Sequence, residues 1–249
     1  MKPIAMRVAH RLAHRRRGAV ESYFEVPAQR GVPDLVIADF INELSSRPQV
    51  TEASALAVWL TATDLVRHRS DQEVTTRELA LATGMSLGHV SGNCLPRLRE
   101  VGFTEQLGRG RWRILELFRD RTRTLVTVEL KRRDWRQGIR QAALHGRGAD
   151  RAWLVMDASA FAHDPDQVRT SECRSVAVNR EIGVATVQQG GRLDVLAPAS
   201  VGGPRAHSRR SAAISRAILA ERAWHLRATG LTSGPLFPVF GRVDKSAAV

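Results

Sequence analysis

The chain has little that would tie it to an oxidising compartment or to a membrane. It contains only 2 cysteines in 249 residues, Cys94 and Cys173, and their spacing fits neither a disulfide framework nor a metal site. No apolar run is long enough to span a bilayer, and the basic N-terminus lacks the apolar stretch of a secretory signal. No repeat or low-complexity tract is present. We therefore expect a cytoplasmic protein without membrane contact.

Acidic residues are scarce beside basic ones. The 38 lysines and arginines against 25 aspartates and glutamates give a net charge of +13 and a pI near 11.3. Such an excess attracts polyanions, nucleic acids above all, although arginine also accumulates in proteins from GC-rich genomes without a functional reason. The basic residues gather in residues 7–17, 109–113, 119–123, 131–140 and 205–227.

Two short fragments carry the chemistry. Pro33-Asp34 opens one apolar run, and Glu129-Leu130-Lys131 closes another. In a strand, residues two apart share a face, so Glu129 and Lys131 project together while Leu130 packs into the core. Asp34, Glu129 and the Leu130 carbonyl would supply the oxygen ligands that Mg²⁺ takes, with Lys131 beside an attacking water.

These fragments resemble the signature of the PD-(D/E)xK, or restriction-endonuclease-like, nuclease superfamily: Pro-Asp, then Glu or Asp, any residue, Lys. The resemblance implies an α/β fold with a mixed sheet flanked by helices. It also implies Mg²⁺, or Mn²⁺ in its place, bound by Asp34 and Glu129. The implied reaction is hydrolysis of DNA phosphodiester bonds that leaves 5′-phosphate and 3′-hydroxyl ends, with Lys131 acting on the water.

Further elements fit this family. After Lys131 we expect a polar helix over residues 132–141, a strand over 152–156, a helix over 168–182 and a hairpin of 184–187 with 193–196.

Two further residues have alternative interpretations. Gln137, with Gln141 one turn later, could contact a phosphate or position the lysine, or could simply lie on a wet helix face. We expect Glu21 in a helix before the first strand, where some family members carry an additional acidic residue; a solvated glutamate is the alternative. His145 receives no role.

A folded insertion separates the two fragments. A helix begins near Glu52, Thr75 with Glu78 forms a capping box for a second helix before Gly84, and Ser86 can cap a third. A hairpin of residues 103–107 and 112–117 follows. This succession resembles winged helix-turn-helix domains, which bind double-stranded DNA.

The winged-helix resemblance implies a set of DNA contacts on the third helix and the hairpin. Pro96 departs from the usual pattern, and we expect it to kink the third helix or to shift its start. The candidate DNA-binding residues are Arg77, Ser86, His89, Ser91, Asn93, Arg97, Arg109, Arg111 and Arg113.

We divide the chain into an N-terminal part of the nuclease core (1–45), an inserted winged helix (46–118) and a C-terminal part of the core (119–249). A C-terminal helix over residues 208–226 docks on the core, forms a dimer contact or binds phosphate.

The sequence thus predicts a metal-dependent deoxyribonuclease, in foreign-DNA defence or DNA repair, and a homodimer would explain double-strand cleavage. The alternatives are a transcriptional regulator or antitoxin-like repressor on a nuclease-like scaffold, and a nuclease that acts on RNA.

Overall fold

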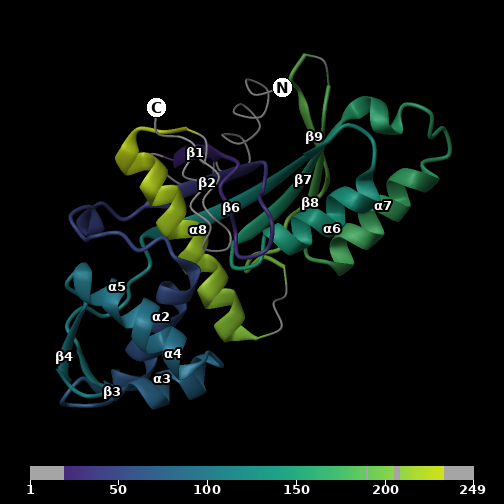
Figure 1. The fold of residues 1–249 in the computed structure, drawn as a ribbon. Coiled ribbons are helices and arrows are strands. Elements are labelled where there is room, and N and C mark those ends of the chain that lie inside the picture. Colours follow the sequence, from purple (N-terminus) through teal and green to yellow (C-terminus); the bar gives the residue numbers. More distant parts are fainter. Residues whose placement is uncertain (1–19, 189, 205–207, 233–249) are drawn as a thin grey trace, which may run out of the picture. The chain divides into compact units, whose positions relative to one another are not determined.

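The computed structural model describes residues 20–188, 190–204 and 208–232 and divides the chain into two compact units. Residues Ile41–Arg121 form one unit, inserted into the other (Figure 1). The expected insertion, residues 46–118, lies within the first of these. The basic residues 7–17 and most of the tail expected after Gly230 lie outside the described residues.

A mixed six-stranded sheet forms the centre of the larger unit. The strand order is β1-β2-β6-β7-β8-β9, with β6, β7 and β8 parallel and the outer pairs antiparallel. The strands are β1 (Val20–Phe24), β2 (Leu35–Phe40), β6 (Thr122–Lys131), β7 (Arg151–Asp157), β8 (Gly183–Val187) and β9 (Leu193–Ala197). A short helix, η3 (Ala158–Phe161), follows β7.

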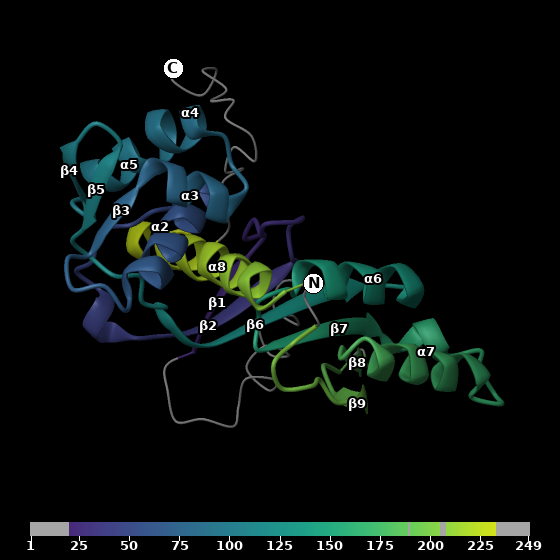
Figure 2. The same ribbon diagram turned by 90° about the horizontal axis from the view of Figure 1, so that it is seen from below.

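Three helices cover the same face of this sheet: α6 (Trp135–His145), α7 (Val168–Asn179) and α8 (Arg209–Thr229) (Figures 1 and 2). Ile139 of α6 packs with Leu154 of β7, while Trp224 of α8 packs in a second cluster with Leu125 of β6. Val126 and Val128 of β6 point to the opposite face of the sheet, because side chains alternate along a strand. Among the helices described, none has the length and apolar character needed to cross a membrane.

The expected mixed sheet flanked by helices is confirmed, with two local corrections. Glu21 lies in β1 and not in a helix, because residues 20–24 pair antiparallel with β2. The helix after β7 ends at Asn179, before the expected Ile182, which is fully buried after the helix. The C-terminal helix begins after its cap, Ser208, and docks on the sheet, as one of its three interpretations proposed.

The inserted unit places helices beside a three-stranded antiparallel sheet with the order β3-β5-β4. A short helix, η1 (Asn42–Leu44), opens the unit. Its other elements are α2 (Ala53–Val66), β3 (Glu73–Thr75), α3 (Thr76–Thr83), α4 (Leu87–His89), η2 (Val90–Cys94), α5 (Leu95–Glu100), β4 (Thr104–Gly108) and β5 (Arg111–Ile114). Trp59 of α2 is fully buried and stacks on Phe103. The strand β3 was not expected.

Several local predictions in this unit are confirmed. Thr75 and Glu78 form the capping box of α3, and Gly84 ends that helix in the left-handed region, at φ 71°. The Ser86 side chain accepts a hydrogen bond from the His89 N–H and so caps α4.

Pro96 neither shifts the start of the third helix, which lies nine residues earlier at Leu87, nor interrupts its helical path. The helical path runs from Leu87 to Glu100 and widens into a π-helical segment, η2, immediately before α5. The Leu95 N–H donates to the Val90 carbonyl, five residues earlier. The wider turn accommodates a ring that lacks an N–H and would collide with the carbonyl four residues before it in a regular α-helix.

The inserted unit is connected to the sheet at two neighbouring positions, the end of β2 and the start of β6. Phe40 at the end of β2 pairs with Thr122 at the start of β6. The next residue, Ile41, donates its N–H to the Arg121 carbonyl over 2.7 Å. By connectivity, the whole unit is therefore a long connection within a β-hairpin.

Candidate active site

The two fragments of the sequence meet at one end of the β2–β6 ladder. Leu35 pairs with Val128, so the same antiparallel register sets Asp34 opposite Glu129, one residue further on. Residues opposite each other in such a ladder share a face. The Leu130 N–H donates to Asp34 Oδ2 over 2.7 Å and holds this carboxylate at the strand end.

Glu129 is the most buried group of the cluster, with 3% of its side chain exposed. Lys131 Nζ lies 2.9 Å from its Oε1, and His145 Nδ1 lies 3.1 Å from its Oε2. Both carboxylate oxygens therefore accept a hydrogen bond. Lys131, in contrast, is 24% exposed, so the cluster reaches solvent on the lysine side.

The charges of the cluster affect Asp34. Burial raises the pKa of this carboxyl above its ordinary value, and the Leu130 N–H opposes the change. The negative charge of Glu129 also raises the pKa of Asp34, while Lys131 and His145 lower it. The two carboxylates repel each other, and a cation between or beside them would offset that repulsion.

Helix α6 packs directly against the stem of Lys131. A Cβ added at Gly138 would lie 2.6 Å from a methyl group of Leu154 and 3.0 Å from Lys131 Cγ, so only glycine allows this approach. Asp134 fixes the start of the helix, since its side chain accepts a hydrogen bond from the Gln137 N–H over 2.9 Å. The strand end and the helix start together set the direction of the lysine.

The loop that ends at Asp34 is held from α8. Arg222 donates to the Pro27 carbonyl over 2.9 Å, and Ser215 Oγ donates to Gln29 Oε1 over 2.6 Å. The Glu25 N–H donates to the Asp34 carbonyl over 3.2 Å. Arg222 and Ser215 are both buried, so α8 supports this loop and does not present Arg222 to a phosphate.

The two glutamines of α6 differ in their surroundings. Gln137 is exposed, and the structure does not bring it into the buried cluster. Gln141 lies between Gly138 and His145 in the turns that pack on the cluster, and its Oε1 is buried without a hydrogen-bond partner among the described residues. Such an oxygen is suited to a water molecule or a hydrated ion.

Glu21 does not join the site. It pairs with Ala38, four residues beyond Asp34 along β2, which corresponds to roughly 13 Å at the rise of a strand. Its carboxylate accepts a hydrogen bond from the Tyr23 hydroxyl and forms an ion pair with Arg227 at 3.0 Å. Glu21 therefore ties β1 to α8.

The donor set fits a hard divalent cation such as Mg²⁺. Asp34 and Glu129 offer two carboxylates, and the Leu130 carbonyl is at the same strand end; Mg²⁺ needs only one or two carboxylates and keeps several waters. Within residues 20–188, 190–204 and 208–232, no group of three or more His, Cys, Asp or Glu side chains is arranged to hold a metal. A site of the Mg²⁺ type does not require such a group.

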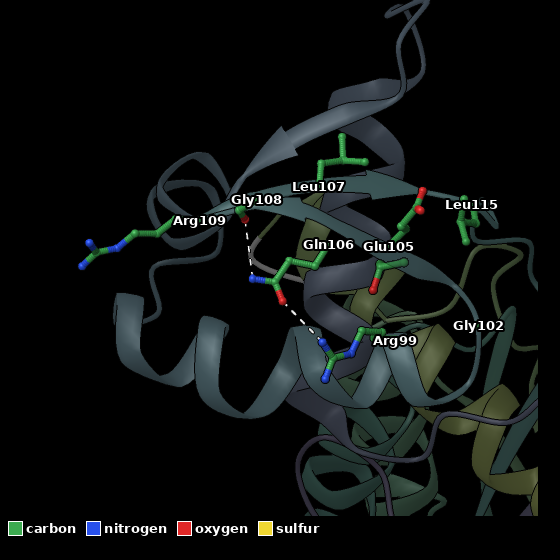
Figure 3. Close-up of a pocket in the computed structure, with 9 residues that line it drawn as sticks. Arg99, Gly102, Glu105, Gln106, Leu107, Gly108, Arg109 and Leu115 are labelled. Atoms are coloured by element: carbon green, nitrogen blue, oxygen red, sulfur yellow. Dashed lines mark hydrogen bonds between the residues drawn. The ribbon is translucent and has the colours of Figure 1, made fainter.

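The candidate DNA-binding arginines of the inserted unit fall into two groups. Arg97 forms ion pairs with Glu52 and Glu100, Arg111 pairs with Glu73, and Arg113 pairs with Glu73 and Glu105. Arg77 and Arg109 are exposed. Figure 3 shows Arg109 extending from the hairpin tip, away from Arg99 and from the Gln106 side chain that Arg99 contacts, beside an open hollow of about 830 Å³.

The remaining candidates lie along the start of the third helix. Ser91 and Asn93 are exposed, and the Asn93 amide lies 3.0 Å from His89 Nδ1. Ser86 is engaged as the cap of α4. The structure thus places Ser86, His89, Ser91 and Asn93 on one short stretch, next to Gly88 and Gly92.

The inserted unit carries little of the positive charge. It contains eleven arginines, no lysine and ten acidic residues, which leaves a net charge of +1 out of +13 for the chain. Trp112, an aromatic residue of its hairpin, is buried and donates to Thr76 Oγ1 over 3.2 Å.

Comparison of the chain with models of protein families, with curated proteins and with solved structures finds no match.

Proposed function

We propose that the chain is a metal-dependent deoxyribonuclease with an inserted winged-helix unit, of the type the sequence resembles. One observation carries the proposal: the β2–β6 register sets Asp34 opposite Glu129, and Lys131 lies within 2.9 Å of that same glutamate. Two carboxylates and a strand-end carbonyl can hold the metal ion, and an amine can act on the water, in metal-assisted phosphodiester hydrolysis.

Asp34, Glu129 and the Leu130 carbonyl would hold Mg²⁺, or Mn²⁺ in its place. The ion supplies Lewis-acid stabilisation of the charge that develops on the scissile phosphate. The buried Oε1 of Gln141, which has no hydrogen-bond partner in the described part of the chain, would receive a hydrogen bond from water at the same site.

Lys131 orients or deprotonates the attacking water. It is one of only three lysines among 38 basic residues. The difference between lysine and arginine matters here, because an arginine stays protonated. The pKa of a lysine, in contrast, can be lowered by its surroundings until the amine accepts a proton. Glu129 Oε1 and the flat surface of Gly138 fix the direction of its side chain.

The DNA backbone would lie along the arginines that follow Lys131. Arg132, Arg133 and Arg140 are exposed on the turn and on the outer face of α6. One arginine can donate two parallel hydrogen bonds to the oxygens of a phosphate, so these side chains would hold the duplex beside the cluster.

The inserted unit would direct the nuclease to its target. The order helix, strand, helix, helix and hairpin supports a winged helix, with α4 and η2 as the elements that enter the major groove. With a net charge of +1, this unit would add selectivity more than general affinity.

The experiment is cleavage of supercoiled plasmid and of linear duplex DNA with Mg²⁺, Mn²⁺ or EDTA. We expect metal-dependent cutting that Glu129→Gln and Lys131→Ala abolish. Glu172→Gln, an exposed carboxylate of the same unit paired with Arg136, is the matched control and should cut like the unsubstituted protein.

The proportion of nicked and linear product would report single- or double-strand cleavage. An absence of cutting in every condition, with DNA binding retained by all variants, would instead favour a DNA-binding regulator, which needs none of Asp34, Glu129 and Lys131. A single-stranded RNA substrate in a parallel reaction tests the third interpretation.

A further inference from the structure

His145 occupies an unusual place for a histidine to which the sequence gives no role. It lies in the last turn of α6, with 9% of its side chain exposed, and its Nδ1 is 3.1 Å from Glu129 Oε2. Glu129 is itself buried. An imidazole that meets a buried carboxylate in this way donates its Nδ1–H, because an ionised carboxylate only accepts hydrogen bonds.

The other side of the same ring touches the loop that carries Asp34. A Cβ built on Gly31 would lie 2.2 Å from His145 Nε2 and 2.5 Å from its Cδ2. Gly31 has φ +85°, and its carbonyl accepts the Ala28 N–H over 2.9 Å in a tight turn. At this position only glycine can adopt such a positive φ without strain and also approach the ring so closely, because it has no Cβ. A single ring therefore stands between Glu129 and the residues that lead to Asp34.

We propose that His145 is a positioning residue that sets both the orientation of the Glu129 carboxylate and its separation from Asp34. This inference rests on the proposed nuclease function. The Glu129 carboxylate has about four acceptor positions, and Lys131 and His145 use one on each oxygen. The two donors thereby determine the directions in which the remaining lone pairs face a cation.

Hydrogen bonds to a metal-binding carboxylate tune the affinity of the site, and removal of such a partner typically reduces metal affinity about 10- to 100-fold. A buried histidine that only fills space would have no such effect. The two roles make opposite predictions for two substitutions. His145→Asn keeps an N–H near the position of Nδ1 but removes volume, while His145→Leu keeps the volume and removes the donor.

The test measures Mn²⁺ binding to the full chain by calorimetry or by electron paramagnetic resonance, together with thermal unfolding without metal. We expect His145→Leu to weaken Mn²⁺ binding about tenfold or more, and His145→Asn to stay within about threefold of the unsubstituted protein. The exposed His163→Leu is the matched control in the same unit and should leave both measurements unchanged.

Cleavage assays complete the test. High Mn²⁺ concentration should restore part of the cleavage activity that His145→Leu loses, because a weakened metal site fills by mass action. The activity lost on substitution of Lys131 should not return in this way. Equal Mn²⁺ affinities in both His145 variants and the unsubstituted protein would overturn this inference alone. A loss of Mn²⁺ affinity in both His145 variants that follows their loss of thermal stability would also overturn it. Absence of Mn²⁺ binding by the unsubstituted protein would overturn the nuclease proposal and this inference together.

Discussion

In the inserted unit, acidic side chains meet arginines at the surface, whereas in the sheet unit two acidic side chains meet each other at a strand end. Glu73 illustrates the first arrangement, with Arg111 at 2.6 Å and Arg113 at 3.4 Å. Asp34 and Glu129 illustrate the second, with Lys131 and His145 as cationic or potentially cationic partners among the described residues. Exposed ion pairs contribute little to stability, about 0–1 kcal/mol each, and cost little to open. A pair of like charges that is partly buried is costly, and functional sites are where such pairs are typically found.

The largest effect is expected at Lys131. Lys131→Arg keeps the charge beside Glu129 but replaces an amine that can accept a proton with a guanidinium that stays protonated. We expect single-turnover DNA cleavage to slow about 10²- to 10⁴-fold, the usual contribution of a general base. Arg174→Lys, the reverse exchange at an exposed position on α7, is the control. Cleavage by Lys131→Arg within threefold of the unsubstituted protein would show that charge alone is needed.

The next effect concerns the stability of the inserted unit. Arg121 is fully buried and donates to the carbonyls of Leu44, Arg47 and Pro48 over 2.5–2.7 Å. Arg121→Met would leave these acceptors without that donor and should destabilise the unit by about 3 kcal/mol or more, measured by urea unfolding. Exposed Arg119→Met is the control. Mn²⁺ binding should be unchanged; its loss would mean that the two units are not independent in function.

A smaller effect should separate the arginines of the hairpin. Arg109→Ala should reduce the slope of log affinity for duplex DNA against log salt by about 0.9, the value for one lost phosphate contact. Arg111→Ala should change it less, because Arg111 must first leave Glu73. Fluorescence anisotropy at several salt concentrations measures both, with the exposed Arg67→Ala directly after α2 as the control. Unchanged slopes in all three variants would remove the inserted unit from the DNA interface.

The smallest effect should appear at Asp34. The pKa of Asp34 is raised in the folded protein, so its contribution to stability is present below its ordinary value of about 3.8 and is lost as the pH rises through the folded pKa. Asp34→Asn keeps an oxygen for the Leu130 N–H and removes the charge. We expect this variant to be more stable than the unsubstituted protein at neutral pH, with the difference vanishing in acid. Thermal unfolding across the pH range tests this, and a variant that is less stable at pH 7 would contradict it.

Local patterns allowed much of the inserted unit to be predicted. Thr75, Gly84 and Ser86 act on residues three or four positions away, so their capping roles can be derived from the sequence itself. Strand β3 has only three residues and exists because it pairs with β5, nearly forty residues later, so no local pattern reveals it. Pro96 alone indicates that the regular hydrogen bonding of the helix is disturbed, but not that the helix adapts with a π-helical turn.

The same distinction applies to the candidate site. Glu129 and Lys131 could be selected because alternation along a strand fixes which residues share a face. Asp34 could be selected because Pro33-Asp34 resembles the first half of the nuclease signature. Glu21 was misplaced, because the pairing of β1 with β2 overrides the local preference of its segment. His145 was missed, since its partners Glu129 and Gly31 become neighbours only through the fold. Its spacing of seven residues from Gly138, two turns along the same side of α6, is the one signal that could have identified it.

The pairing of Phe40 with Thr122 has a consequence for how the molecule could be rearranged. Since the chain leaves and returns at neighbouring positions, residues 41–121 could be exchanged for a short turn, or for another domain with adjacent ends, without a change in strand order. Under the proposed function, a sheet built in this way can acquire a new target by replacement of one continuous segment of its gene. The distance between Asp34 and Glu129 along the chain is then a measure of how large an inserted unit the hairpin carries.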